Sequence, residues 1–149
     1  MTVEPRTPAP DSPVRALSHI ALAVREADPV AAMLVAALGA TRGDEEILDG
    51  GALRLVFVHL GPVTFELLEP RSPDHTVAKF LDARGPGLHH VSLEVADIEA
   101  ALARAKSAGV RLIDEAPRAG AHGTRVAFLH PNSVFGVLIE LCQPKERRG

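Results

Sequence analysis

Two histidines and two glutamates stand at matching places in this 149-residue chain. His19 and His90 each lie near the start of an alternating segment, LSHIALAV at residues 17–24 and HVSLEV at residues 90–95. Glu66 and Glu140 lie inside the apolar segments TFELLE and VLIELC. Imidazole nitrogens and carboxylate oxygens are donors that divalent transition metals bind in the absence of thiolates. Together these residue types could support metal-assisted chemistry.

The four positions belong to an internal repeat. The spacing from His19 to His90 is nearly the same as the spacing from Glu66 to Glu140. Self-similarity at a nearly fixed offset indicates a duplicated structural unit. If each unit presents one imidazole and one carboxylate to a shared concavity, two nitrogens and two oxygens converge on one point. The repeat therefore predicts a divalent metal site.

A glutamate inside so apolar a strand needs compensation. Strand alternation places Glu140 on one face with Leu138 and Cys142, and an unpaired buried carboxylate costs several kcal/mol. A dication bound by Glu66 and Glu140 supplies that compensation, and Co, Ni, Mn, Fe and Zn all suit the donor set. Taken singly, each histidine also fits a hydrogen-bonded residue at the core edge, and each glutamate fits an edge-strand residue facing water.

The elements that must position these residues follow from hydrophobic period and turn residues. Asp28 and Pro29 predict the N-cap and first position of a helix that Gly39 ends. A capped helix is likewise expected from Asp97 to Gly109. The remaining segments are a loop at 41–51, strands at 53–60 and 63–69, a helix at 72–84, and strands at 125–130 and 137–142. The order is two copies of strand, helix, strand and strand, with room for one further short strand in each.

Composition restricts the function classes. Hydrophobic residues make up 46% and charged residues 23% of the chain, which suits one compact domain. A net charge of −3 and 3% aromatic residues argue against nucleic acid as a partner, and no apolar run reaches the length of a membrane span. The single cysteine, Cys142, excludes an intramolecular disulfide framework, so a cytoplasmic protein is expected. Residues 1–14 are expected to form a disordered tail, and residues 15–149 a single domain.

Longer stretches carry a family resemblance. SHIALAV, FELLEP, AKFLDARGPGLHHVSLEVADIEAAL, GVRLIDEAPR and RVAFLHPNSVFGVLIELCQP resemble the vicinal-oxygen-chelate superfamily and, within it, the methylmalonyl-CoA epimerase family. The resemblance implies an α+β fold of two repeated βαβββ modules, forming a cup-shaped curved mixed sheet with helices on the outer face. Module one would span residues 15–70, a connecting helix 72–85, and module two 86–144. His19, Glu66, His90 and Glu140 fall on the family's four metal-ligand positions.

The same resemblance implies a reaction. The chain would interconvert the 2R and 2S forms of methylmalonyl-CoA by abstracting the C2 proton, through an enolate that a divalent ion, cobalt by resemblance, stabilises. Glu140 and Glu66 are the candidates for proton transfer. Some relatives carry a further glutamate in the third strand, where the alignment puts Leu55, so the second proton-transfer group is left open. The alternatives are a glyoxalase I-type lyase acting on a thiol hemithioacetal and a non-catalytic small-molecule-binding protein of the same fold.

Three further features bear on the site and its surroundings. Strand alternation predicts His89 on the face opposite His90, as a structural residue or an edge hydrogen-bonder. The glycine-containing segment 120–123, with His122, is a candidate flap over the cup. The helix segment 30–38 is apolar around most of its circumference, which favours a homodimer contact; a thick core within one chain would give the same pattern.

Overall fold

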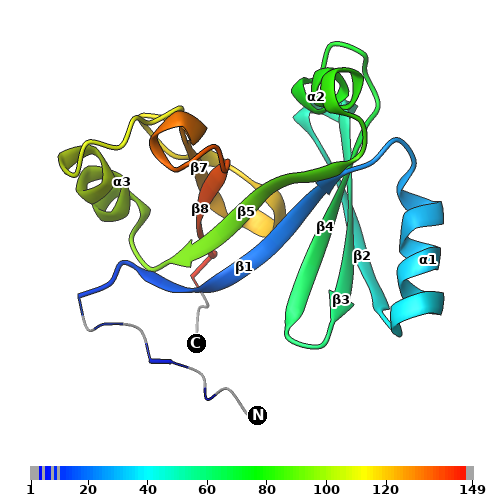
Figure 1. Ribbon diagram of the computed structural model, residues 1–149, viewed down its shortest axis with the longest axis horizontal. Helices are drawn as coiled ribbons and strands as arrows, with labels where there is room; N and C mark the ends of the chain where they lie inside the picture. The colour runs from blue at the N-terminus through cyan, green and yellow to red at the C-terminus, as the bar shows by residue number, and fades with distance from the viewer. Residues whose placement is uncertain (1–3, 5, 8, 10, 147–149) are drawn as a thin grey trace.

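The computed structural model describes residues 4, 6, 7, 9 and 11–146, so the tail predicted for residues 1–14 lies in part outside the described residues. The strands form one eight-stranded mixed sheet in the order β2-β3-β4-β1-β5-β8-β7-β6 (Figure 1). The strands are β1 (Val14–Ala23), β2 (Thr41–Leu48), β3 (Leu53–Leu60), β4 (Val63–Pro70), β5 (Gly87–Val95), β6 (Arg118–Ala119), β7 (Arg125–Leu129) and β8 (Ile139–Gln143). The helices are α1 (Ala27–Leu38), α2 (Thr76–Arg84) and α3 (Ile98–Ser107), with 3-10 turns η1 (Asp49–Gly51), η2 (Ala121–Gly123) and η3 (Pro131–Ser133).

Element order confirms the two βαβββ modules. The first module runs through β1, α1, β2, β3 and β4, the second through β5, α3, β6, β7 and β8, and α2 connects them. Figure 1 shows β1 and β5 side by side in the middle of the curled sheet, with one module on each side. The fold is therefore the expected α+β cup.

The register of the central strands sets the positions of the repeated residues. β1 and β5 pair antiparallel, with His19 opposite Ser92 and Ala21 opposite His90. Each central strand also pairs in parallel with the last strand of its own module, so that Ala21 lies beside Glu66 and Ser92 beside Glu140. Both histidines and both glutamates are thus brought to the centre of the sheet by backbone pairing.

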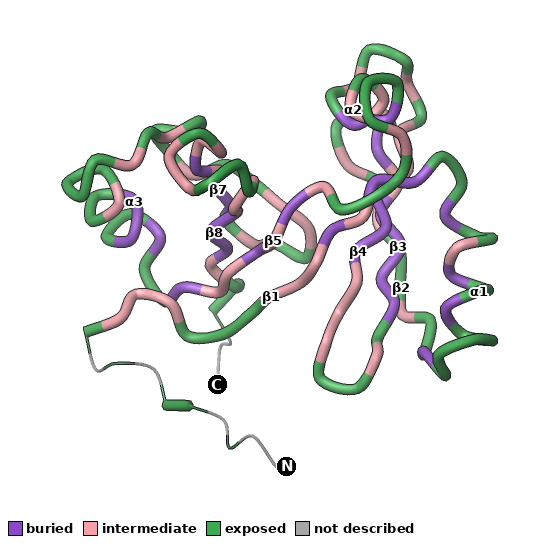
Figure 2. Tube along the Cα trace, viewed as in Figure 1, coloured by how far each residue is buried: buried purple, intermediate pink, exposed green. Residues whose placement is uncertain are grey.

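The predicted apolar faces pack on helices. Leu22 of β1 and Val24, the residue after β1, belong to a cluster with Ala31 and Leu34 of α1, and Leu93 and Val95 of β5 belong to a cluster with α3. Buried stretches follow these strands, while the outward side of α1 is exposed (Figure 2). Because α1 and α3 both pack on the apolar face of the sheet, the opposite face lines the cup.

The predicted cap of α1 is wrong. The helix begins at Ala27 with Glu26 at the N-cap, and the side chain of this N-cap residue makes no capping hydrogen bond. The Ala27 N–H instead donates to Glu69 Oε2 at 2.7 Å, and Asp28 forms ion pairs with Arg42 and Arg54. A tertiary contact thus replaces the local cap. The predicted end is confirmed, because Gly39 adopts a left-handed conformation with φ of 67°.

The loop predicted at residues 41–51 is also wrong for most of its length, because residues 41–48 form the edge strand β2. Gly, Asp and Glu have low intrinsic β propensity, but pairing with β3 and cross-strand charge pairs override it. Arg54 of β3, for example, donates to Glu45 of β2. Charged residues also suit an edge strand, since they discourage pairing with another chain.

Candidate metal centre

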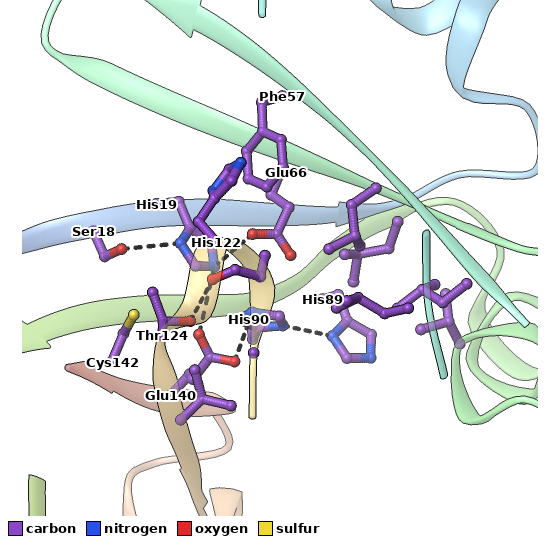
Figure 3. Close-up of a pocket in the computed structure, with 18 of the residues that line it drawn as sticks. Ser18, His19, Phe57, Glu66, His89, His90, His122, Thr124, Glu140 and Cys142 are labelled. Carbon is purple, nitrogen blue, oxygen red and sulfur yellow. Dashed lines mark hydrogen bonds and ion pairs between the residues drawn. The ribbon is translucent and has the colours of Figure 1, made fainter. Parts of the chain in front are cut away.

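Four side chains from four strands converge at the centre of the cup (Figure 3). One potential ligand atom from each of His19, His90 and Glu140 lies within 4.8 Å of the other two. His19 Nε2 lies 3.1 Å from Glu66 Oε2 and 3.5 Å from Glu140 Oε1. His90 Nε2 lies 3.7 Å from Glu140 Oε2. The structure thus brings all four predicted residues together, with Glu66 against His19 and outside the mutually close set of three.

Burial determines the charge state of this cluster. Desolvation raises the pKa of Glu66 to about 8, with the nearby charge of Glu140 as a second cause. Desolvation also raises the pKa of Glu140 to about 7. For His19 and His90, burial lowers the pKa to about 4 and about 2, respectively. Both imidazoles are therefore neutral at neutral pH, and two carboxyl groups are held where ionisation is costly without a cation.

The donor atoms fit a divalent ion. Within the described part of the chain, the buried Nε2 atoms of His19 and His90 have no hydrogen-bond partner. A buried polar atom without a partner is costly, and a neutral imidazole nitrogen is also a common metal ligand. Two such nitrogens with two carboxylates are a donor set for Co, Ni, Mn, Fe or Zn.

The two halves of the centre differ in one hydrogen bond. Ser92 Oγ donates to Glu140 Oε1 at 2.8 Å, and Ser92 is fully buried. The register places Ala21 in the equivalent position beside Glu66, and alanine has no side-chain donor. The hydrogen bond favours the ionised form of Glu140, which agrees with a smaller rise in its pKa than in that of Glu66.

Comparison with known proteins identifies the family to which the chain belongs. The profile of the glyoxalase/bleomycin resistance protein/dioxygenase superfamily matches residues 18–128. The chain belongs to this superfamily. It is 39% identical over 128 residues to the mitochondrial methylmalonyl-CoA epimerase of Bos taurus, covering 85% of this chain and 73% of that protein.

Solved structures in the superfamily are also similar to this chain. The crystal structure of methylmalonyl-CoA epimerase from Mycobacterium tuberculosis has a TM-score of 0.86 and 34% identity, and the match covers 93% of each chain. A methylmalonyl-CoA epimerase in complex with methylmalonyl-CoA and NH4+ has a TM-score of 0.81 and 30% identity, over 88% of this chain and 95% of that one.

The candidate metal centre lies in a cavity of about 340 Å³ lined by both modules. The segment predicted as a flap is η2, which reaches from module two to module one. His122 Nε2 lies 2.7 Å from Asp44 Oδ2, and the His122 N–H donates to Glu46 Oε2 at 2.9 Å. The His122 ring also packs on Phe57, with centroids 4.6 Å apart. η2 therefore bridges the rim of the cavity.

The predicted face of His89 is wrong, whereas a hydrogen-bonding role agrees with the structure. His89 lines the same cavity as His90, and the two Nδ1 atoms are 2.8 Å apart. The register of β1 with β5 passes from Ala21 opposite His90 to Leu22 opposite Leu88, so His89 is the extra residue of a β-bulge. A bulge changes the direction of a side chain, so simple alternation fails at this point.

One further carboxylate near the centre, that of Glu46, is not predicted from the sequence. Glu46 of β2 pairs with Leu55 of β3, and Leu55 lines the cavity. Directly paired residues of antiparallel strands share a face of the sheet, so Glu46 lies on the cavity face. Its charge also contributes to the raised pKa of Glu66. A strand assignment for residues 41–48 would have placed Glu46 on this face. Leu55, where some relatives have a glutamate, is 1% exposed and belongs to the core.

Proposed function

We propose that this chain is a divalent-metal-dependent epimerase that interconverts the 2R and 2S forms of methylmalonyl-CoA. The observation that carries the proposal is the convergence of two neutral imidazoles and two buried carboxyl groups in a cavity shared by both modules. The similarity to methylmalonyl-CoA epimerases over most of the chain supports the choice of substrate.

His19, His90, Glu140 and Glu66 would hold the ion, with cobalt as the proposed native metal. A divalent ion supplies Lewis-acid polarisation of a carbonyl group and so favours loss of the neighbouring proton. The two buried carboxyl groups offset the positive charge of the ion, and the low pKa values of His19 and His90 keep both imidazoles available at neutral pH.

Glu140 is the proposed proton-transfer group on one face of the substrate. In the metal-free protein burial raises its pKa to about 7, so once displaced from the ion this carboxyl group can both accept and donate a proton near neutral pH. The hydrogen bond from Ser92 fixes one carboxylate oxygen, so the other oxygen is the one available to a proton. Ser92 is therefore a positioning residue for Glu140.

Glu46 is the proposed proton-transfer group on the other face. Epimerisation requires an acceptor on one face of the reacting carbon and a donor on the other. Glu140 comes from module two, while Glu46 lies in module one, on the cavity face of the sheet. Glu66 is the other candidate from the sequence, but like Glu140 it is also assigned to holding the metal, whereas Glu46 is not a proposed ligand.

Solvent deuterium uptake at C2 of methylmalonyl-CoA tests the function. We expect the chain to catalyse exchange and epimerisation, and EDTA to abolish both, with recovery on adding Co²⁺. Thioester formation from a hemithioacetal without C2 exchange would instead indicate the lyase. Binding without either reaction would indicate a small-molecule-binding protein and would contradict the proposal.

Glu46→Gln tests the assignment of the second face. With one proton-transfer group left, the variant should exchange the C2 proton of one epimer while epimerisation falls by about 100-fold or more. Glu45→Gln is the matched control, because Glu45 binds Arg54 on the outside of the sheet. Full epimerisation by Glu46→Gln would contradict the role of Glu46.

We further propose a homodimer in the cytoplasm. Met33, Val35 and Leu38 of α1 are 52%, 41% and 61% exposed, and a second copy of this chain would cover this apolar surface. The buried free thiol of Cys142 suits a reducing compartment. None of the helices among the described residues has the length and hydropathy needed to cross a bilayer. Light scattering of the purified chain should give twice the monomer mass, and Met33→Glu should reduce it to that of the monomer.

A further inference from the structure

Each of the two central histidines follows a bulged residue. In β1, Leu17 pairs with Leu93 and His19 with Ser92, so Ser18 is the extra residue. In β5, His89 is the extra residue in the same way. Ser18 precedes His19 as His89 precedes His90, so the two bulges occupy equivalent positions of the repeat. The duplicated fold therefore repeats the bulge at the metal centre as well as the ligands.

The bulges bring both extra side chains to the same atom of the following histidine. Ser18 Oγ lies 3.0 Å from His19 Nδ1, and His89 Nδ1 lies 2.8 Å from His90 Nδ1 (Figure 3). In each case the Nε2 atom on the other side of the ring faces the cluster of carboxyl groups. The two modules thus make equivalent contacts with chemically different partners.

These contacts bear on the tautomer of each ring. A neutral imidazole carries one proton, and a hydrogen bond donated by Nδ1 leaves the lone pair on Nε2. Two Nδ1 atoms at 2.8 Å need one proton between them, so either His89 or His90 is the donor. Since His90 Nε2 has no partner in the described part of the chain, donation by His90 leaves that atom ready for a cation.

We propose that Ser18 and His89 are positioning residues that accept the Nδ1–H of His19 and His90 and hold both Nε2 lone pairs toward the metal centre. Partners of this kind usually alter metal affinity by about 10–100-fold. His89 is itself held in place, because its ring packs against Phe80 with centroids 5.0 Å apart. This inference rests on the metal centre of the proposed function and is independent of the substrate.

Zn²⁺ affinity of the EDTA-treated full chain, measured by competition with a chelating dye, is the first test. Ser18→Ala and His89→Leu remove the acceptor, and each should weaken Zn²⁺ binding by about 10–100-fold. Ser18→Thr keeps the oxygen acceptor and His89→Asn replaces the nitrogen acceptor with an amide oxygen, so both should recover most of the affinity. His130→Leu is the control, because His130 accepts from the Asn132 N–H at the start of η3 and does not line the cavity.

The tautomers of the metal-free protein give a second readout that packing alone would not change. Nitrogen NMR should show His19 and His90 protonated at Nδ1, with N–N coupling between His90 and His89. In Ser18→Ala, the His19 proton should move to Nε2. Urea unfolding of each metal-free variant identifies any that do not fold, and the threonine and asparagine variants then supply the comparison.

Two results would overturn the inference. One is protonation of both rings at Nε2 in the metal-free wild-type chain. The other is Zn²⁺ affinity within twofold of wild type in folded Ser18→Ala and His89→Leu. A chain that binds Zn²⁺ as expected but exchanges no C2 deuterium would refute the proposed epimerase and leave the roles of Ser18 and His89 intact.

Discussion

Glu66→Gln should stabilise the metal-free protein at neutral pH, although it removes a proposed metal ligand. Burial raises the pKa of Glu66 in the folded protein from 4.5 to about 8. Between pH 4.5 and about pH 8, the Glu66 carboxyl group keeps its proton in the folded protein but has lost it in the unfolded chain. The free energy of unfolding therefore falls as the pH rises from about 4.5 to about 8, and a glutamine removes this fall.

The expected magnitude follows from the same values. One pKa unit corresponds to about 1.4 kcal/mol, so at pH 7 the pKa rise of Glu66 lowers the free energy of unfolding by roughly 3 kcal/mol. Below pH 4 the carboxyl group is neutral in both states, and the penalty disappears. Glu66→Gln should thus have little effect at pH 4 and raise the free energy of unfolding by about 2–3 kcal/mol at pH 7.

Urea unfolding of EDTA-treated protein between pH 4 and pH 9 measures this difference. Glu115→Gln, at an exposed glutamate, is the control and should show no comparable trend. Zn²⁺ should reverse the order, because an amide oxygen is a weaker ligand than a carboxylate. The reasoning is refuted if Glu66→Gln destabilises the metal-free protein at pH 7, or if its effect is the same at pH 4 and pH 7.

Four further substitutions test particular contacts. Asp97→Ala removes a side chain that caps α3 and should lower the free energy of unfolding by about 1 kcal/mol. Asp28→Ala, at the wrongly predicted cap, should lower it less, because it removes only exposed ion pairs. Leu67→Ala leaves a cavity at a fully buried site beside α1 and should lower the free energy of unfolding by about 2–5 kcal/mol. Ser92→Ala removes the hydrogen bond to Glu140, so the pKa of Glu140 should rise further, and the loss of metal-free stability with rising pH should extend to a higher pH.

Local and periodic features of the sequence predict most of the elements. Alternation locates β1, β3 and β5, Asp97 marks the start of α3, and Gly39 marks the end of α1, because each depends on residues close in the chain. The repeat of His19 with His90 and of Glu66 with Glu140 predicts one shared site without any knowledge of the contacts. Duplication makes this possible, since β1 and β5, the equivalent first strands of the two modules, pair with each other.

The sequence fails where a distant partner decides the local structure. Residues 41–48 resemble a loop, but pairing with β3 makes them a strand and brings Glu46 to the cavity face. Asp28 resembles a helix cap, but Arg42 and Arg54 bind it instead. Strand β3 and the two arginines are too far along the chain from the residues they contact for a helix or turn pattern to reveal these contacts.

What the sequence by itself determined is the duplicated strand and helix pattern and the four residue types that meet at its centre. Only the tertiary structure decided the bulges at Ser18 and His89, because a bulge depends on how two strands from different modules align. It also decided the pKa values of Glu66 and Glu140, because these depend on how completely both modules exclude water from the site.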